Sequence, residues 1–279
     1  MVITKLSRKQ FANFGTWVRI PLTPPNHIGG FILEENRKKE IIKIAIALFV
    51  LVIIFIIVAI IMMKYQVEGE TNMPFNLSKV TVVSTAEGIS QGETTEKWNL
   101  EVVQDNDIYF TIEKNENYQK EEVIQNIKIE NIQIIKEPQV GQVKIYMPNS
   151  LEGRTFQNKE SFLIQDKKLT YQGAVKSNLK TLEIGNQGGM VAIRIANTEL
   201  GNYISNEDEE IIHDGTLIQK LGYEKETISF TVSFDFIIEL KNKSYKTTVQ
   251  LEMPCADIIE QGTGNQEIID TKQFIFKRM

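Results

Sequence analysis

The chain has 279 residues, of which 42% are hydrophobic and 24% charged, and its formal net charge is −5. This composition excludes collagen-like, low-complexity and disulfide-rich small proteins. Nucleic-acid binding is not expected either, because nucleic-acid partners usually require a basic chain. The averages conceal one stretch, residues 44–63, that contains no charged side chain.

The N-terminal segment, residues 1–40, is predicted to be a basic tail that is too short for a core of its own. A helix over residues 3–20 would place apolar and basic side chains on opposite sides, with Phe11, Phe14 and Trp17 on the apolar side. Such a helix suits the anionic inner surface of a membrane or the groove of a partner protein. The alternative is a tail without helical structure, in which these side chains align by chance.

The apolar stretch at residues 44–63 predicts a membrane anchor. A helix of this length measures about 30 Å, the thickness of the hydrocarbon core of a bilayer. A lone segment in lipid must satisfy its own backbone hydrogen bonds, so we expect a transmembrane helix over residues 41–64. A buried core helix is the alternative, and a cleaved signal peptide is disfavoured because no small-x-small site follows. The side chains expected to contact lipid include Ile44, Leu48, Val52, Phe55, Ile60 and Met63.

The charges on either side of this stretch predict its orientation. Residues 1–43 carry a net charge of +5, which leaves −10 for the rest of the chain. The basic side chains nearest to the apolar stretch are Arg37, Lys38, Lys39 and Lys43. The positive-inside rule therefore places the N-terminus in the cytoplasm and the C-terminal part outside the cell membrane.

The C-terminal part is predicted to be one all-β domain. Residues 65–77 are polar enough for a linker, and residues 78–279 show alternating apolar and polar side chains. The alternation is clearest in residues 227–240, which a turn at Asn242 and Lys243 separates from a second alternating run. A sheet with one polar, solvent-exposed face and one apolar, buried face is typical of an antiparallel sheet packed on another layer. We therefore expect an antiparallel β-sandwich or jelly-roll-like domain.

Several other stretches are candidate strands. They are residues 79–85, 123–136, 142–147, 179–184 and 190–197. Asp105 and Asn106 are predicted to form a tight hairpin turn, since both tolerate turn dihedral angles. The run before that turn begins with Trp98, which we expect to lie in the core. Residues 185–189 are predicted to be a turn, and residues 207–222 fit a short helix better than a strand.

Motifs for catalysis or metal binding are sparse in the predicted domain. His213 is its single histidine and Cys255 its single cysteine, whereas a zinc site needs three or four ligands. Cys255 is expected to be a small buried hydrophobic residue rather than a nucleophile. A Ser-x-x-Lys sequence at residues 177–180 lacks its companion motifs, and the acidic residues 207–210 fit a solvated loop better than a calcium site. No catalytic residue, metal or cofactor is predicted.

The leading hypothesis is a non-enzymatic interaction or scaffold module tethered to the cell envelope. Its expected contacts are the lipid bilayer and either an envelope protein or a wall polysaccharide. One alternative is a polysaccharide-binding jelly roll. Another is an extracytoplasmic glycosidase with two carboxylates about 5–10 Å apart in a cleft. A fourth hypothesis is a signalling protein whose tail contacts a cytoplasmic partner.

The tail helix can be tested with a synthetic peptide of residues 1–22. Its circular dichroism spectrum should gain helical signal with anionic vesicles, because the basic side would face the lipid headgroups and the Phe and Trp side the acyl chains. Neutral vesicles serve as the control. A spectrum unchanged by anionic vesicles would rule out the lipid-surface helix.

Overall fold

The structure is a computed structural model that describes residues 28–91, 98–149, 155–175, 181–205 and 216–279, with side chains from Glu35 onward. The predicted tail helix at residues 3–20 lies outside these ranges. The chain divides into two units, Met1–Ile61 and Met62–Met279.

A single long helix, α1 (Ile28–Glu68), contains the apolar stretch. Its part Glu35–Glu68 has a mean hydropathy of 3.7 in its most apolar window, none of which is buried, so it is long and apolar enough to cross a membrane. Gly69 ends the helix in a left-handed conformation (φ 70°), and its N–H donates to the Tyr65 carbonyl oxygen at 2.9 Å. The predicted lipid-contacting residues all lie exposed on this helix: Ile44, Leu48, Val52, Phe55, Ile60 and Met63. The basic residues Arg37, Lys38, Lys39 and Lys43 are on it as well.

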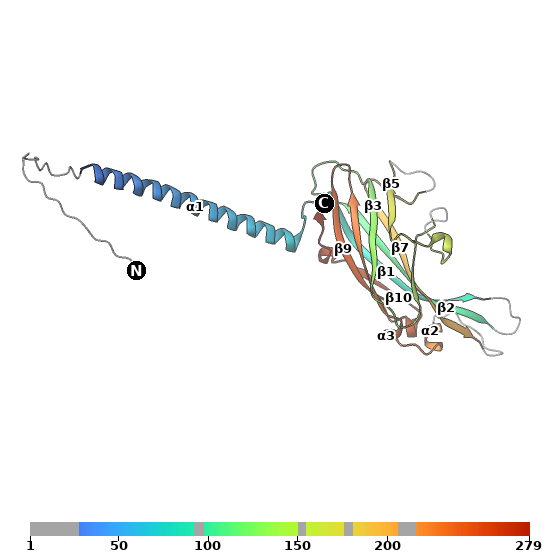
Figure 1. Cartoon of the computed structure of the whole chain (residues 1–279). Coiled ribbons are helices and arrows are strands. Elements are labelled where there is room, and N and C mark those ends of the chain that lie inside the picture. The colour runs from blue at the N-terminus through green and yellow to red at the C-terminus, as the bar shows by residue number, and fades with distance from the viewer. Residues whose placement is uncertain (1–27, 92–97, 150–154, 176–180, 206–215) are drawn as a thin grey trace, which may run out of the picture. The chain divides into compact units, whose positions relative to one another are not determined.

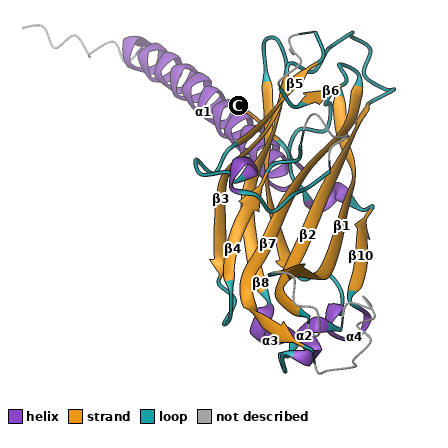
Figure 2. Ribbon diagram, turned by 90° about the vertical axis from the view of Figure 1, so that its right-hand side faces the viewer, coloured by secondary structure: helices purple, strands orange, loops and turns teal. Residues whose placement is uncertain are grey.

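The second unit contains two sheets, in which every strand pair is antiparallel except β5 with β6. The first, sheet A, has the order β10-β1-β2-β7-β4, and the second, sheet B, has the order β11-β9-β8-β3-β5-β6 (Figure 2). The strands of sheet A are β1 (Phe75–Ser90), β2 (Asn99–Lys114), β4 (Gln142–Tyr146), β7 (Gly188–Ile204) and β10 (Thr263–Ile268). Those of sheet B are β3 (Asn126–Lys136), β5 (Leu169–Gly173), β6 (Glu183–Ile184), β8 (Phe230–Glu239), β9 (Ser244–Met253) and β11 (Lys277–Arg278).

Short helices complete the described part of the unit. They are η1 (Glu160–Phe162), α2 (Leu217–Lys220), α3 (Lys225–Ile228), α4 (Ile258–Gln261) and η2 (Thr271–Gln273). The three α-helices lie together at the end of the unit where β1 ends and β2 begins (Figures 1 and 2).

The two sheets contribute to one main hydrophobic core. Phe110 on β2 lies with its ring centroid 5.7 Å from that of Phe234 and 4.8 Å from that of Phe236, both on β8. All three side chains are at most 1% exposed. The alternation predicted for residues 227–240 is therefore the pattern that buries one face of β8 against sheet A, although residues 227 and 228 belong to α3 rather than to the strand.

The predicted hairpin turn at Asp105 and Asn106 is wrong. Both residues lie in the middle of β2, where Asp105 is paired with Thr85 of β1 on one side and with Ala196 of β7 on the other. The strand continues through these polar residues because each side chain finds a partner within the fold. The chain reverses between β1 and β2 instead.

Asn106 belongs to a buried polar layer on the inner face of sheet A. Ser84 Oγ donates to Asn106 Oδ1 at 2.7 Å, and Asn106 Nδ2 donates to the Ile195 carbonyl oxygen at 2.9 Å. Gln104 and Asn197 are also fully buried, and Gln104 Oε1 and Asn197 Oδ1 have no hydrogen-bond partner in the described part of the chain.

The polar layer separates the main core from a second, smaller one, the distal core. On each of the three central strands of sheet A, a polar residue of this layer lies between a residue of the main core and one of the distal core. The distal core joins the ends of β1, β2 and β7 to the short α-helices, and its buried members are Ala86, Leu100, Val102, Leu200, Leu217, Ile218, Ile228 and Ile258.

Several other sequence predictions can be compared with the structure. The turn at Asn242 and Lys243 is confirmed, since the Leu240 N–H donates to the Lys243 carbonyl oxygen at 2.9 Å. The turn at residues 185–189 is confirmed by a hydrogen bond from the Gly188 N–H to the Gly185 carbonyl oxygen. The placement of Trp98 in the core is wrong, because its side chain precedes β2 and is 52% exposed.

Replacement of Phe110 by Ala should lower the free energy of unfolding by about 3–5 kcal/mol, because it leaves a cavity between the two sheets. Chemical denaturation of the full chain in detergent, followed by circular dichroism, measures this loss. Ile135→Ala is the control, since Ile135 is 56% exposed and its truncation should change stability by less than about 0.5 kcal/mol. An equal loss of unfolding free energy for the two substitutions would contradict a core shared by the two sheets.

Candidate functional site

The most densely connected group of charged side chains is the Arg194 cluster, which comprises Asp105, Asp107, Asn158 and Arg194. Asp105 and Asp107 are two residues apart on β2, and Arg194 is paired with Asp107 on the neighbouring strand β7. Because side chains alternate along a strand, these three point away from the main core. Asn158 reaches them from the connection between β4 and β5.

Arg194 joins both carboxylates. Its Nε and Nη2 donate to the two oxygens of Asp107 at 2.6 and 2.9 Å, a bidentate geometry, and its Nη1 donates to Asp105 Oδ2 at 2.7 Å. Asn158 Nδ2 donates to Asp105 Oδ1 at 2.8 Å, and its Oδ1 accepts from Arg194 Nη1 at 3.2 Å. The Phe156 ring covers the guanidinium, with its centroid 5.1 Å from Arg194 Cζ.

The cluster shifts the ionisation of Asp105. Burial raises the pKa of this carboxyl group to about 6, against the opposing effects of Arg194 and the Asn158 hydrogen bond. Arg194 is shared with Asp107, and Glu87 and Asp107 add further negative charge that raises the pKa of Asp105. The pKa of Arg194 is raised as well, because its bonds to the carboxylates outweigh the effect of burial.

Two neighbouring carboxylates, one with a raised pKa, resemble the acid–base pair that the glycosidase hypothesis requires. The low solvent exposure of both carboxylates argues against that role. The Asp105 side chain is 1% exposed and the Asp107 side chain 16%, and both are engaged by Arg194. This geometry fastens the β4–β5 connection to sheet A. The sequence does contain a signal for this pair, two acidic residues at i and i+2, but the Asp and Asn composition there also favours a turn.

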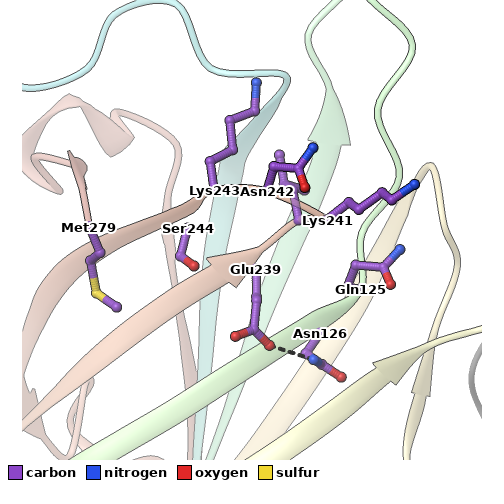
Figure 3. A pocket seen from close by; sticks show the side chains of 9 residues that line it. Gln125, Asn126, Glu239, Lys241, Asn242, Lys243, Ser244 and Met279 are labelled. Carbon is purple, nitrogen blue, oxygen red and sulfur yellow. Dashed lines mark hydrogen bonds between the residues drawn. The ribbon is translucent and has the colours of Figure 1, made fainter.

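A polar pocket of about 570 Å³ lies at the turn between β8 and β9 (Figure 3). Figure 3 shows Asn126 and Glu239 side by side, joined by a hydrogen bond, with Lys241 and Lys243 on the turn. Lys243 donates to the Tyr118 hydroxyl oxygen at 2.6 Å and pairs with Glu122 at 3.0 Å. Burial opposes the charge of Lys243, but these two bonds raise its pKa overall. No aromatic ring lines the pocket within the described part of the chain, so it offers no stacking platform for a sugar.

Exposed apolar side chains gather at the far ends of the long strands, a region that we call the strand tip. Ile89 is the penultimate residue of β1, Trp98 precedes β2, and Ile204 ends β7; they are 39%, 52% and 62% exposed. The register places Ile89 and Ile204 on one face of the strand ends, since Glu101 is opposite Ile89 and Asn99 is opposite Ile204, and Trp98 directly precedes Asn99 at the same end. Figure 1 shows these strand ends extending past the rest of the sheet.

The remaining chemistry-bearing residues named from the sequence form no further site. Cys255 is half-buried and packs against the main core, where its N–H donates to Ser84 Oγ at 3.1 Å. His213 and residues 177–180 and 207–210 lie outside the described residues, as do Phe11, Phe14 and Trp17. The described residues contain no group of three or more His, Cys, Asp or Glu that could hold a metal ion.

Comparison with known proteins gives no guide to these features. No family model matches the chain, and no curated protein or solved structure matches it.

The Asp105 carboxyl group should make stability depend on pH. Its pKa is about 6 in the folded chain and near 3.8 otherwise, so the folded state binds more protons between these values. Protonation of Asp105 therefore stabilises the folded chain fully below pH 4. This stabilisation is lost as pH rises through 6, and the free energy of unfolding falls by on the order of 3 kcal/mol.

Denaturation of the full chain in detergent between pH 4 and 7.5 measures this loss, and Asp105→Asn should remove it. Asp166→Asn, which alters an exposed carboxylate, should leave the pH profile as in the unmodified chain. If the stability of the Asp105→Asn variant depended on pH as strongly as that of the unmodified chain, the raised pKa of Asp105 would be contradicted.

Proposed function

We propose that the chain is a single-pass membrane protein whose N-terminus is cytoplasmic and whose second unit is an extracytoplasmic antiparallel β-sandwich. In this proposal the β-sandwich is a non-enzymatic interaction or scaffold module, and its partner is another protein of the cell envelope. The exposed apolar stretch of helix α1, residues 44–63, supports the anchor. The basic residues on its N-terminal side support the orientation.

The architecture is proposed from the two sheets and their common core. Phe110 of sheet A meets Phe234 and Phe236 of sheet B, and this contact between inner faces is the arrangement expected of a sandwich.

The observation that carries the proposed role is the strand tip. Large apolar side chains on the surface of a protein mark interaction sites when they gather, and tryptophan is enriched among residues that dominate binding energy. Trp98 is 52% exposed and directly precedes β2, at the same strand ends as Ile89 and Ile204. The strand tip lies at the end of β1 away from Phe75: β1 has 16 residues, and at ~3.3 Å per residue it spans about 50 Å.

The charged clusters support a non-enzymatic role. Each carboxylate of the Arg194 cluster is held by the guanidinium, and Asp105 is closed to solvent. Charge-assisted hydrogen bonds of this kind stabilise a fold and would have to break before either group could transfer a proton.

A photoreactive amino acid in place of Trp98 tests the role. In intact cells it should form a discrete cross-linked product with one envelope protein, whereas the same amino acid at Ile135, an equally exposed position outside the strand tip, should not. Trp98→Ser should weaken that association by at least about tenfold without lowering the unfolding temperature, because hot-spot tryptophans contribute roughly 2 kcal/mol or more.

Protease added to the same intact cells should digest the β-rich unit, since the proposed topology places it outside. Cross-linking that is equal at both positions, or absent at both, would refute the role of the strand tip.

A further inference from the structure

A second concave region lies at the opposite end of β1 from the strand tip. This junction groove has a volume of about 760 Å³ and is lined by the last turn of α1, the start of β1, the end of β2 and the segment around η2. Its deepest side chains are apolar and nearly inaccessible: Met73, Leu77, Phe274 and Phe276 are at most 8% exposed. The groove therefore has an apolar floor.

Charged side chains of both signs line the same groove. They are Glu70, Glu113, Lys114 and Lys272, with Glu68 at the helix end. Glu68 pairs with Lys64, whereas the other four form no ion pair with any residue of the described ranges. Two unpaired ammonium groups and two unpaired carboxylates thus face one cavity, and a ligand that carries both charges would complement them.

The position of the groove indicates where such a ligand would come from. Val67 lines the groove and follows Met63, the last residue of the apolar stretch, by four helical residues. At ~1.5 Å per residue this is about 6 Å, and the headgroup layer on each side of a bilayer is roughly 5–7 Å thick. Val67 therefore lies at the depth of the headgroups if the apolar stretch fills the hydrocarbon core.

Exposed aliphatic side chains surround this end of the second unit. Val67 is 71% exposed, Ile269 70% and Ile275 36%. Ile269 directly follows Ile268, which is paired with Val80 near the start of β1, and Ile275 lies against Gly69. Such side chains are costly in water but are compatible with a surface that contacts lipid.

We propose that the junction groove binds the headgroup and glycerol region of an aminophospholipid, such as phosphatidylethanolamine, from the outer leaflet. The inference rests on the membrane anchor of the proposed function. Lys114 and Lys272 hold the phosphate, and Glu70 and Glu113 hold the primary ammonium group. The glycerol and the first methylenes lie on Met73 and Leu77. Each contact pairs a charge that has no protein partner among the described residues with its opposite on the lipid.

The test uses the full chain in nanodiscs that contain a trace of phosphatidylethanolamine with a photoreactive group near its glycerol. After illumination, mass spectrometry should locate the label on residues 67–78 and 271–276. The Lys114→Gln, Lys272→Gln double variant should reduce this labelling about tenfold, as should Thr71→Trp, which fills the groove. Lys136→Gln is the matched control, since Lys136 is an exposed lysine at the other end of sheet B, and it should label as the unmodified chain does.

The headgroup requirement is tested by substitution of the lipid. Phosphatidylglycerol with the same photoreactive group lacks the ammonium and should label the groove several-fold less. Equal labelling by both lipids, label spread evenly along the exposed surface, or no effect of the groove variants would overturn the aminophospholipid site and leave the anchor intact. A chain that fails to enter nanodiscs at all would overturn the anchor, and the lipid site with it.

Discussion

The second unit depends on one constraint, which is that β2 must be hydrogen-bonded along both edges. It lies between β1 and β7 in sheet A and pairs with them over nearly its full length. A central strand with a polar sequence in its middle is stable only if each polar side chain is satisfied on its own face. Asn106 meets this need inside the fold through Ser84 and a carbonyl of β7, and Asp105 and Asp107 meet it outside through Arg194.

The features that follow a simple periodicity could be predicted from the sequence. The apolar stretch forms one helix, and the alternation of residues 227–240 identifies a strand that buries one face. The turns at Asn242 and Gly185 could also be predicted, because Asn and Gly are common in turns. In each case the local sequence and the tertiary structure favour the same conformation.

The features that depend on distant partners could not be predicted in this way. Asp105 and Asn106 have the composition of a turn, and only Arg194 and Ser84, far away in the chain, make a strand favourable there. Trp98 has the right spacing for a core face, but the strand extends beyond the core at that point. Strand β10 contains Thr, Gly, Asn and Gln and carries no alternation, and its pairing with β1 defines it.

The two ends of the second unit differ in chemistry. The strand tip presents exposed apolar side chains, whereas the junction groove combines an apolar floor with charges of both signs that have no ion-pair partner among the described residues. The first is suited to a protein surface and the second to an amphipathic molecule. Between these two ends, the charged side chains of the Arg194 cluster are hydrogen-bonded to one another.

The buried polar layer has a consequence for how the second unit fluctuates. Its polar side chains separate the eight buried side chains of the distal core from the main core, and the side-chain oxygens of Gln104 and Asn197 have no hydrogen-bond partner among the described residues. Loosening of α2, α3 and α4 therefore exposes only the small distal core, at a free-energy cost well below that of global unfolding. The strand tip adjoins this mobile region, because β1, β2 and β7 all contribute side chains to the distal core, while the two sheets around the main core remain folded.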